Sequence, residues 1–212
     1  MRHDLLKPVP QGSDGAYSEE NRRIQEISNE LQRLCCLYEK ESGNSPSNGN
    51  RLETEQRVTE HFAKSNGLWI PLDSVFGLGV PGPSGNENDT YVADNTIFKV
   101  NNLFNSGSII GLLEKVLLHN LLFPNTAYNL FGFTGYDGRS VMPILRQNRV
   151  PNARPATQVM IDTYMAALGF TKTDREGRYT NGTYEAWDLL PRNVLIDDDG
   201  DLYVVDAEIR RS

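Results

Sequence analysis

Apolar residues recur at helical spacing near the start of the chain. Steps of three and four residues separate Ile24, Ile27, Leu31, Leu34 and Tyr38, which places them on one face of an amphipathic helix. Ser18 is the expected N-cap, and the Ser/Gly/Asn-rich residues 41–50 are expected to form a linker. Three further helices are predicted over residues 52–65, 108–122 and 157–168.

Between the helices predicted at 52–65 and 108–122 the pattern changes to that of β-strands. Residues 90–93 and 96–100 flank Asp94-Asn95, a pair that favours a tight hairpin turn. Residues 68–70 and 74–80 also read as extended, so three antiparallel strands are expected here. A second hairpin is predicted from residues 130–134 and 140–145, around Tyr136-Asp137-Gly138-Arg139.

A third hairpin is predicted close to residue 212. Residues 194–196 and 202–205 are β-branched and apolar, and the acidic residues 197–201 between them read as a solvated turn with Gly200 at positive φ. Acids at 197, 199, 201 and 208 have the spacing of an EF-hand. The sixth position of that motif requires Gly and here holds Leu202, so we reject a calcium site.

Polar residues stand at the open end of this third hairpin. Asn193 directly precedes its first strand and Asp206 directly follows its second, and antiparallel pairing returns both to the same side. An amide oxygen and a carboxylate suit Mg²⁺, which takes its other ligands from water and phosphate. Asp188, five residues before Asn193 (193 − 188 = 5), adds a carboxylate where a substrate hydroxyl could approach. The pattern predicts a phosphoryl-transfer site.

The run Asp188–Asn193, D-L-L-P-R-N, resembles the D-L-K-P-x-N catalytic loop of protein kinases. The step from Asn193 to Asp206 (206 − 193 = 13) is similar to that between the catalytic-loop Asn and the DFG Asp. Together with the phrase LLHNLLFPNTAYNLFGF, these features resemble the small kinase-like domain of polyvalent proteins from bacterial mobile elements, from about Leu52 onward. The resemblance implies ATP and Mg²⁺ as cofactors and a minimal bilobal α+β fold. That fold has an antiparallel N-lobe sheet with one helix, a much reduced helical C-lobe and, here, an N-terminal helical extension.

The resemblance also implies a role for Lys99 in I-F-K-V, which is similar to the kinase V-A-I-K strand whose Lys holds the α- and β-phosphates. Glu114 is the only carboxylate between Lys99 and Asp137, and it lies in a largely apolar predicted helix. A lone acid in such a helix is costly to bury without a cation, so an ion pair between Lys99 and Glu114 is expected. His119, in the same helix, is expected to be a core or capping residue.

A glycine-rich segment precedes the strand at 90–93. Residues 77–82 read G-x-G-x-x-G, but pairing around Asp94-Asn95 would place Gly77 and Gly79 inside a strand. We therefore prefer residues 82–88 as the phosphate-facing tip, with Gly82 and Gly85 as binding candidates, although an ordinary hairpin loop has the same composition. The resemblance places adenine beside the backbone near Ile144 and Leu145.

Composition restricts the class of partner. The chain has 212 residues, 38% of them hydrophobic, and a net charge of −7, which argues against nucleic-acid binding but is compatible with a nucleotide. No membrane span or signal peptide is recognised, so a cytoplasmic protein is expected. Cys35 and Cys36 are adjacent in a helical pattern and are read as helix residues. The first helix could form a homodimer, but packing within its own chain is favoured.

The predicted organisation is an N-terminal tail, helix and linker over 1–50 and a kinase-like domain over 51–212, with an N-lobe at 68–146 and a reduced C-lobe at 147–212. We favour an enzyme that transfers phosphate to a hydroxyl of an unknown protein. Ala186-Trp187 in place of His-Arg, Asp206-Ala207-Glu208 in place of DFG and little room for an activation segment leave two alternatives. These are a pseudokinase that acts as an interaction module and a small-molecule phosphotransferase.

Overall fold

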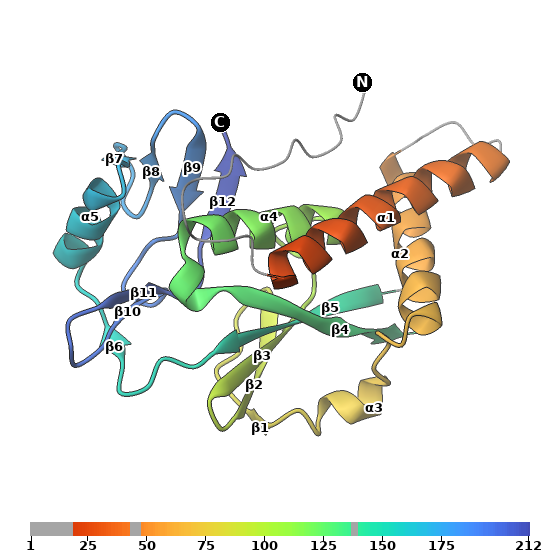
Figure 1. Cartoon of the computed structure of the whole chain (residues 1–212), viewed down its shortest axis with the longest axis horizontal. Coiled ribbons are helices and arrows are strands. Elements are labelled where there is room, and N and C mark those ends of the chain that lie inside the picture. The colour runs from red at the N-terminus through yellow and green to blue at the C-terminus, as the bar shows by residue number, and fades with distance from the viewer. Residues whose placement is uncertain (1–18, 43–47, 137–139) are drawn as a thin grey trace. The chain divides into compact units, whose positions relative to one another are not determined.

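The computed structural model describes residues 19–42, 48–136 and 140–212 (Figure 1). The chain divides into two compact units. The first contains the chain up to Leu117 together with Asn129–Gln147, and the second contains Leu118–Tyr128 together with Asn148–Ser212. Within the described residues, no helix combines the length and apolar character that crossing a membrane requires.

The first unit is built on a five-stranded sheet with the strand order β1-β2-β3-β5-β4. Its strands are β1 (Val80–Pro81), β2 (Asn88–Ala93), β3 (Thr96–Asn101), β4 (Tyr128–Tyr136) and β5 (Ser140–Asn148). β2 and β3 form the predicted antiparallel hairpin, and Asp94 in its turn has a φ of 48°. β1, β2 and β3 pair antiparallel as predicted, but β1 is only Val80–Pro81 and not the predicted residues 74–80. The turn predicted between β4 and β5 includes 137–139, which lie outside the described residues.

The segment before β2 differs from the prediction of an extended strand over residues 74–80. Leu72–Val75 instead forms a short helix, α3, with Pro71 at its N-cap. Backbone bonds from the amides of Ser74, Gly77 and Leu78 each reach back three residues, so these groups are satisfied locally and do not pair with a strand. Val75 is 3% exposed and packs in an apolar cluster of the first unit with Tyr91, Val100 and Ile144.

Two helices, α1 (Glu19–Ser42) and α2 (Asn48–Ser65), precede the sheet and pack against each other. Ile24, Ile27 and Leu31 of the predicted apolar stripe are buried, so α1 uses this face within its own chain. Both helices extend into the predicted linker, of which only residues 43–47 remain, outside the described part of the chain. The predicted N-cap Ser18 also lies outside it.

Strand β4 is an edge of the sheet, and neighbouring segments cover its backbone. Arg23 of α1 donates to the carbonyl of Leu130 over 3.1 Å, and Glu20 accepts from the Leu130 amide over 3.1 Å. Further along β4, the Phe133 backbone exchanges bonds of 2.8 Å with Leu68 and Ile70. These contacts occupy backbone groups that an exposed edge would offer to another chain.

The second unit has a core of its own. It contains a three-stranded sheet (β11-β10-β6), a four-stranded sheet (β12-β9-β8-β7) and helix α5 (Gln158–Ala167), whose N-cap is Thr157. The strands are β6 (Arg154–Pro155), β7 (Thr171–Lys172), β8 (Tyr179–Thr180), β9 (Tyr184–Trp187), β10 (Val194–Ile196), β11 (Leu202–Val204) and β12 (Glu208–Arg211). Buried residues of this core include Ile161, Met165, Tyr179, Leu189 and Val194.

Two predictions about helices are confirmed. Helix α4 (Ile109–Leu122) occupies the predicted range, and the short 3₁₀ helix η1 (Pro124–Thr126) follows it. His119 is 1% exposed, and its Nε2 lies 3.2 Å from the Thr126 carbonyl oxygen. His119 is therefore a buried structural residue, as expected.

Candidate active site

Asp188 follows strand β9 directly and has a left-handed backbone conformation, with a φ of 62°. This conformation strains a residue with a Cβ, so the surrounding contacts must hold it. The Leu190 amide donates to the Asp188 carbonyl over 3.0 Å, and the Asn193 amide donates to the Leu190 carbonyl over 2.8 Å. Arg192, largely exposed, makes an ion pair with the Asp188 carboxylate. The loop therefore turns tightly and presents a half-buried carboxylate.

Asn193 ties the two ends of this loop together. Its Nδ2 donates to the backbone carbonyl of Asp188 over 2.8 Å and to Oδ2 of the same residue over 2.7 Å. The Nδ2 atom is thus engaged in the loop, and the Oδ1 atom is the remaining ligand-type oxygen of the amide.

The predicted hairpin is confirmed by the antiparallel pairing of β10 with β11, from Val194↔Val204 to Ile196↔Leu202. Beyond its open end, the amides of Val205 and Asp206 approach the Asn193 carbonyl at 2.9 and 3.4 Å. The structure thereby brings Asp188, Asn193 and Asp206 together within one unit.

At the closed end of the hairpin, Asp197 organises the acidic turn. Its Oδ1 accepts from the amides of Asp199 and Asp201 over 3.0 and 2.9 Å, and its Oδ2 accepts from the Tyr203 hydroxyl over 2.9 Å. Gly200 has a φ of 90°, as predicted for the turn. The carboxylate of Asp197 is thus used within the turn.

A polar network holds the backbone immediately after Asp188. Gln158 of α5 donates from Nε2 to the Leu189 carbonyl over 3.3 Å and to the Tyr179 hydroxyl over 3.0 Å. Tyr179 in turn donates to Asp162. The Leu189 amide donates to the Gly177 carbonyl over 3.1 Å, so both backbone groups of the residue after Asp188 are held.

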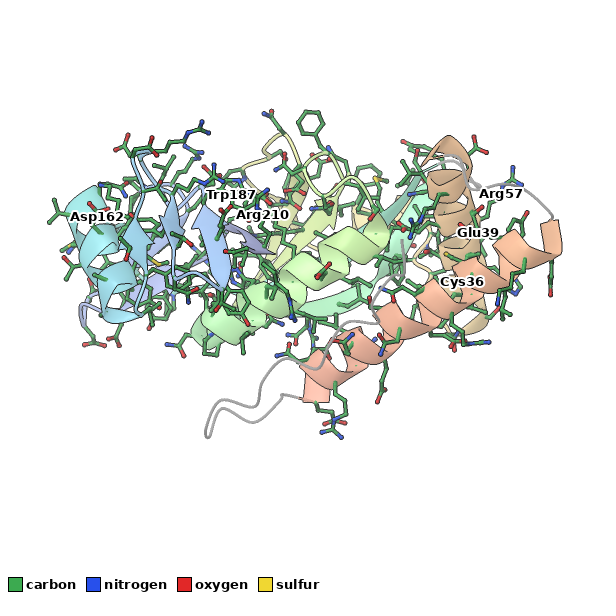
Figure 2. The ribbon with its side chains drawn as sticks, turned by 90° about the horizontal axis from the view of Figure 1, so that it is seen from above. Cys36, Glu39, Arg57, Asp162, Trp187 and Arg210 are labelled. Atoms are coloured by element: carbon green, nitrogen blue, oxygen red, sulfur yellow. The ribbon has the colours of Figure 1, made fainter. Side chains whose placement is uncertain are left out.

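Burial and the hydrogen bonds of this network shift the pKa values of Tyr179 and Asp162. Burial raises the pKa of Tyr179, and the hydrogen bond to the Asp162 carboxylate raises it further, so the hydroxyl stays a donor. Burial also acts to raise the pKa of Asp162, but hydrogen bonds from Lys172, Tyr179 and Gln158 more than offset it and lower the pKa. Asp162 lies on α5 (Figure 2) and is ionised at neutral pH.

Trp187 directly precedes Asp188 and lies between two arginines. The guanidinium carbons of Arg178 and Arg210 are 5.7 and 5.4 Å from its ring centroid, and Figure 2 shows Arg210 beside Trp187. Both arginines also bind the Glu185 carboxylate, at 2.9 and 2.6 Å, and Arg178 contributes most to the lowered pKa of Glu185. These cation–π and ionic contacts hold strand β9, from which Asp188 leaves the sheet. The sequence did not predict this cluster because it depends on the pairing of β9 with β8 and β12, and Arg210 lies more than twenty residues after Trp187.

In the first unit, Lys99 lies on β3 opposite Thr90 of β2 and is 8% exposed. Its neighbours Phe98 and Val100 pack in the cluster with Val75, Tyr91 and Ile144. Side chains alternate along a strand, so Lys99 projects from the other face of the sheet.

Helix α4 makes a different ion pair from the one that the sequence suggested. In the described structure, no ion pair or hydrogen bond joins Lys99 to Glu114, which is half-buried. Instead, the next residue, Lys115, lies 3.2 Å from Glu87, and the two side chains are 12% and 7% exposed. Glu87 follows the glycine-rich segment and also accepts from Asn105 over 3.0 Å. Glu87 precedes Lys99 in the sequence and lies outside the predicted helix, so no local pattern links it to α4.

The glycine-rich segment pairs in a register shifted from the expected one, in which residues 90–93 would face residues 76–80, and Gly77 and Gly79 lie before β1 rather than inside a strand. β1 pairs with β2 through Val80↔Val92 and Pro81↔Tyr91, so residues 82–87 form the loop between the strands. A Cβ on Gly82 would meet the Thr90 hydroxyl at 2.7 Å, and the Gly82 amide donates to the Thr90 carbonyl over 2.9 Å. Gly85 at the tip has open space around it, and its amide donates to Asn88 over 3.0 Å. Gly82 is therefore required for packing, whereas Gly85 is free of steric demand.

The residues predicted to adjoin adenine lie on β5. Ile144 and Leu145 are 0% and 3% exposed, and Ile144 belongs to the apolar cluster of the first unit. Their side chains are thus core residues, and only their backbone groups are candidates for contact with a base.

The oxygen ligands beside Asp188 suit Mg²⁺, an ion that takes only a few of its ligands from the protein. Among the residues that the structure describes, no group of three or more His, Cys, Asp or Glu could hold a metal ion. Asn193 and Asp206 supply an amide and a carboxylate, a small oxygen set that Mg²⁺ completes with water and phosphate oxygens. The residues present therefore fit this ion.

A model of the family described as "Serine/Threonine/Tyrosine Kinase found in polyvalent proteins" matches residues 52–212. The match covers most of the chain and includes Lys99, Asp188, Asn193 and Asp206. The chain therefore belongs to this family, and the resemblance seen in the sequence is confirmed. The mixture of helices and antiparallel sheets is consistent with a kinase-like domain. No curated protein and no solved structure matches the chain.

Proposed function

We propose that this protein is an ATP- and Mg²⁺-dependent phosphotransferase that acts on a hydroxyl group, most reasonably of a protein. The observation that carries the proposal is the constellation of Asp188, Asn193 and Asp206, joined through the Asn193 side chain and backbone. Family membership supports the kinase-like class.

In this proposal each residue has a defined task. Asp188 orients the acceptor hydroxyl and takes its proton as the new O–P bond forms and the bond from the γ-phosphorus to the β-phosphate bridging oxygen breaks. Lys99 holds the α- and β-phosphates, and Gly82 and Gly85 allow the loop to approach them. Asn193 and Asp206 would hold Mg²⁺, which neutralises developing phosphate charge.

Glu114 enters the proposal as the partner of Lys99 when nucleotide is bound. Its carboxylate makes no ion pair among the described residues, so it is available for this role. The base would lie against the backbone of Ile144 and Leu145. Most of the rate enhancement would come from positioning and electrostatics rather than from covalent chemistry.

The experiment compares wild type with Asp206→Ala and with Asp198→Ala, an exposed acid of the same hairpin. Wild type should show a Mg²⁺-dependent thermal shift with ATP and should transfer labelled γ-phosphate to a protein acceptor. Asp206→Ala should lose both properties, while Asp198→Ala keeps them. Retention of both by Asp206→Ala would refute the assignment.

A binding module without activity is the second candidate. It is favoured by Ala186-Trp187 and Asp206-Ala207-Glu208, which depart from the kinase motifs. Nucleotide binding without phosphate transfer to any acceptor would support this candidate. Transfer to a small molecule but to no protein would support a small-molecule phosphotransferase.

A further inference from the structure

A buried carboxylate from helix α2 caps the first turn of helix α4. Glu55 of α2 is 6% exposed and accepts hydrogen bonds from the amides of Ile109 and Ile110. The Ser108 hydroxyl accepts from the Gly111 amide over 2.9 Å, and the Ser108 carbonyl accepts from Leu112 over 3.0 Å. Every amide of this turn is therefore satisfied, the first two by Glu55.

The burial of the Glu55 carboxylate costs free energy of folding. Burial of a carboxylate is unfavourable, and burial is the main reason why the pKa of Glu55 is raised. The amides of Ile109 and Ile110, together with Arg51, act in the opposite direction. From helix α1 the group that faces it is Cys35, whose pKa is raised to about 12, so this thiol stays neutral near pH 7. A neutral residue would avoid this cost of burial, but a carboxylate accepts both amide hydrogen bonds and interacts favourably with the dipole of α4.

The neighbour of Glu55 in the sequence extends the contact to the sheet. Gln56 accepts a hydrogen bond from the amide of Val141 in β5. α2 therefore holds the start of α4 through Glu55 and a strand of the sheet through Gln56.

At the other end of the connection, α4 meets the loop proposed to face the phosphates. Lys115, six residues after Ile109, pairs with Glu87, and the Asn102 amide donates to the Glu87 carbonyl over 2.9 Å. α4 also carries Glu114, the proposed partner of Lys99. A rotation or fraying of α4 at Ile109 would thus displace both the partner of Glu87 and the proposed partner of Lys99.

We infer that Glu55 is a positioning residue for the nucleotide site: its carboxylate fixes the first turn of α4 and thereby sets the helix that carries Glu114 and Lys115. This inference rests on the proposed function. It makes α2, which lies outside the strands and loops that would touch nucleotide, a determinant of nucleotide affinity.

The test uses the full chain with the substitution Glu55→Gln. The glutamine side chain has nearly the same shape but no charge, and its NH₂ group faces one α4 amide with a donor in place of an acceptor. Glu53→Gln is the matched control, because Glu53 is exposed on the same helix. The Kd of Mg·ADP is measured by calorimetry, and exchange of the Ile109 and Ile110 amides by NMR. Glu55→Gln should weaken binding about five- to tenfold and accelerate this exchange, as loss of a helix cap predicts.

A merely structural role would lower global stability along with affinity. Because the buried charge is itself unfavourable, Glu55→Gln should instead unfold at nearly the same denaturant concentration as wild type while binding nucleotide more weakly. If Glu55→Gln does not fold, Glu55→Asp retains the charge but withdraws it by one methylene group. It should weaken binding about threefold, corresponding to partial loss of the cap.

The outcomes separate the inference from the proposed function. Wild-type affinity in the glutamine variant, or in the aspartate variant if that one is needed, overturns the inference and leaves the function standing. If wild type binds no Mg·ADP, the proposed function and the coupling to it both fail. Amide exchange then decides the remaining claim, because unchanged exchange at Ile109 and Ile110 would show that Glu55 does not hold α4.

Discussion

The two units hold their proposed catalytic elements by different means. In the first unit, helix α4 is fixed by two buried carboxylates, Glu55 at its first turn and Glu87 opposite Lys115. In the second unit, the loop that begins at Asp188 rests on Gln158 and on backbone bonds to Gly177. In the first arrangement, loss of the cation beside Glu87 would leave a buried charge uncompensated, whereas the second arrangement distributes its support over several neutral groups.

The two arrangements differ because the unsatisfied backbone groups of a helix end and of a loop point in different ways. A helix end exposes several amides in one direction, and a single carboxylate satisfies two of them and interacts favourably with the helix dipole. A tight loop has backbone groups that point in different directions. Leu189 therefore bonds Gln158 through its carbonyl and Gly177 through its amide.

Lys115→Met tests the first arrangement and should have the largest effect. It leaves the buried Glu87 carboxylate with a hydrogen bond from Asn105 but without its cation, and an uncompensated buried charge costs about 3 kcal/mol. Denaturant unfolding should show this loss. Arg33→Met is the control, since Arg33 pairs with Glu30 at an exposed i,i+3 position, where loss of the ion pair should have little effect on stability. Equal effects of the two substitutions would mean that burial does not distinguish the pairs.

Gly177→Ala tests the second arrangement and should have an intermediate effect. Gly177 has a φ of 66°, and a Cβ there would lie 2.8 Å from Cδ2 of Leu190, two residues after Asp188. We expect a loss of about 2 kcal/mol, from backbone strain plus displacement of the loop, and a fall in kcat.

Gly182→Ala separates these two contributions. Gly182 has a φ of 81° but no atom within 4 Å of the added Cβ, so it reports strain alone, about 1 kcal/mol. A Gly177→Ala protein with the stability and kcat of Gly182→Ala would show that the contact with Leu190 does not position Asp188.

The sequence predicted those parts of the molecule whose signals are local. The hairpin of β10 and β11, the turn at Gly200 and the boundaries of α4 and α5 follow from apolar runs, glycine and capping residues within a few positions of each other. Asp188, Asn193 and Asp206 could be placed together for the same reason. A hairpin alone brings its two ends side by side.

Contacts between distant segments could not be predicted in this way. β8 and β12 are short strands that pair with β9, and β7 pairs in turn with β8; their residues read as polar connections. The pairing of Lys115 with Glu87, and the cap that Glu55 supplies across the gap from α2 to α4, depend on packing that no local pattern encodes.

The last and smallest expected effect is a change in the slope of stability against pH, and it isolates Glu55. Burial raises the pKa of this carboxyl above its ordinary value of 4.5, so the folded protein binds the proton more tightly than the unfolded chain. The stabilisation from this difference is fully present below the unfolded pKa and is lost as the pH rises through the folded pKa. Asp162, whose pKa is lowered, contributes in the opposite direction and in a more acidic range.

Wild type should therefore lose stability relative to Glu55→Gln as the pH rises from about 4.5 toward neutrality. Denaturant unfolding at a series of pH values measures the difference between the two proteins. Subtracting the curve of Glu55→Gln removes the contributions of Asp162 and all other titrating groups, which both proteins share. Glu53→Gln should run parallel to wild type throughout, because Glu53 is exposed and does not contact the first turn of α4. A Glu55→Gln curve parallel to wild type would mean that the carboxyl at the start of α4 is not desolvated, and the contrast between the two units would then lose its physical basis.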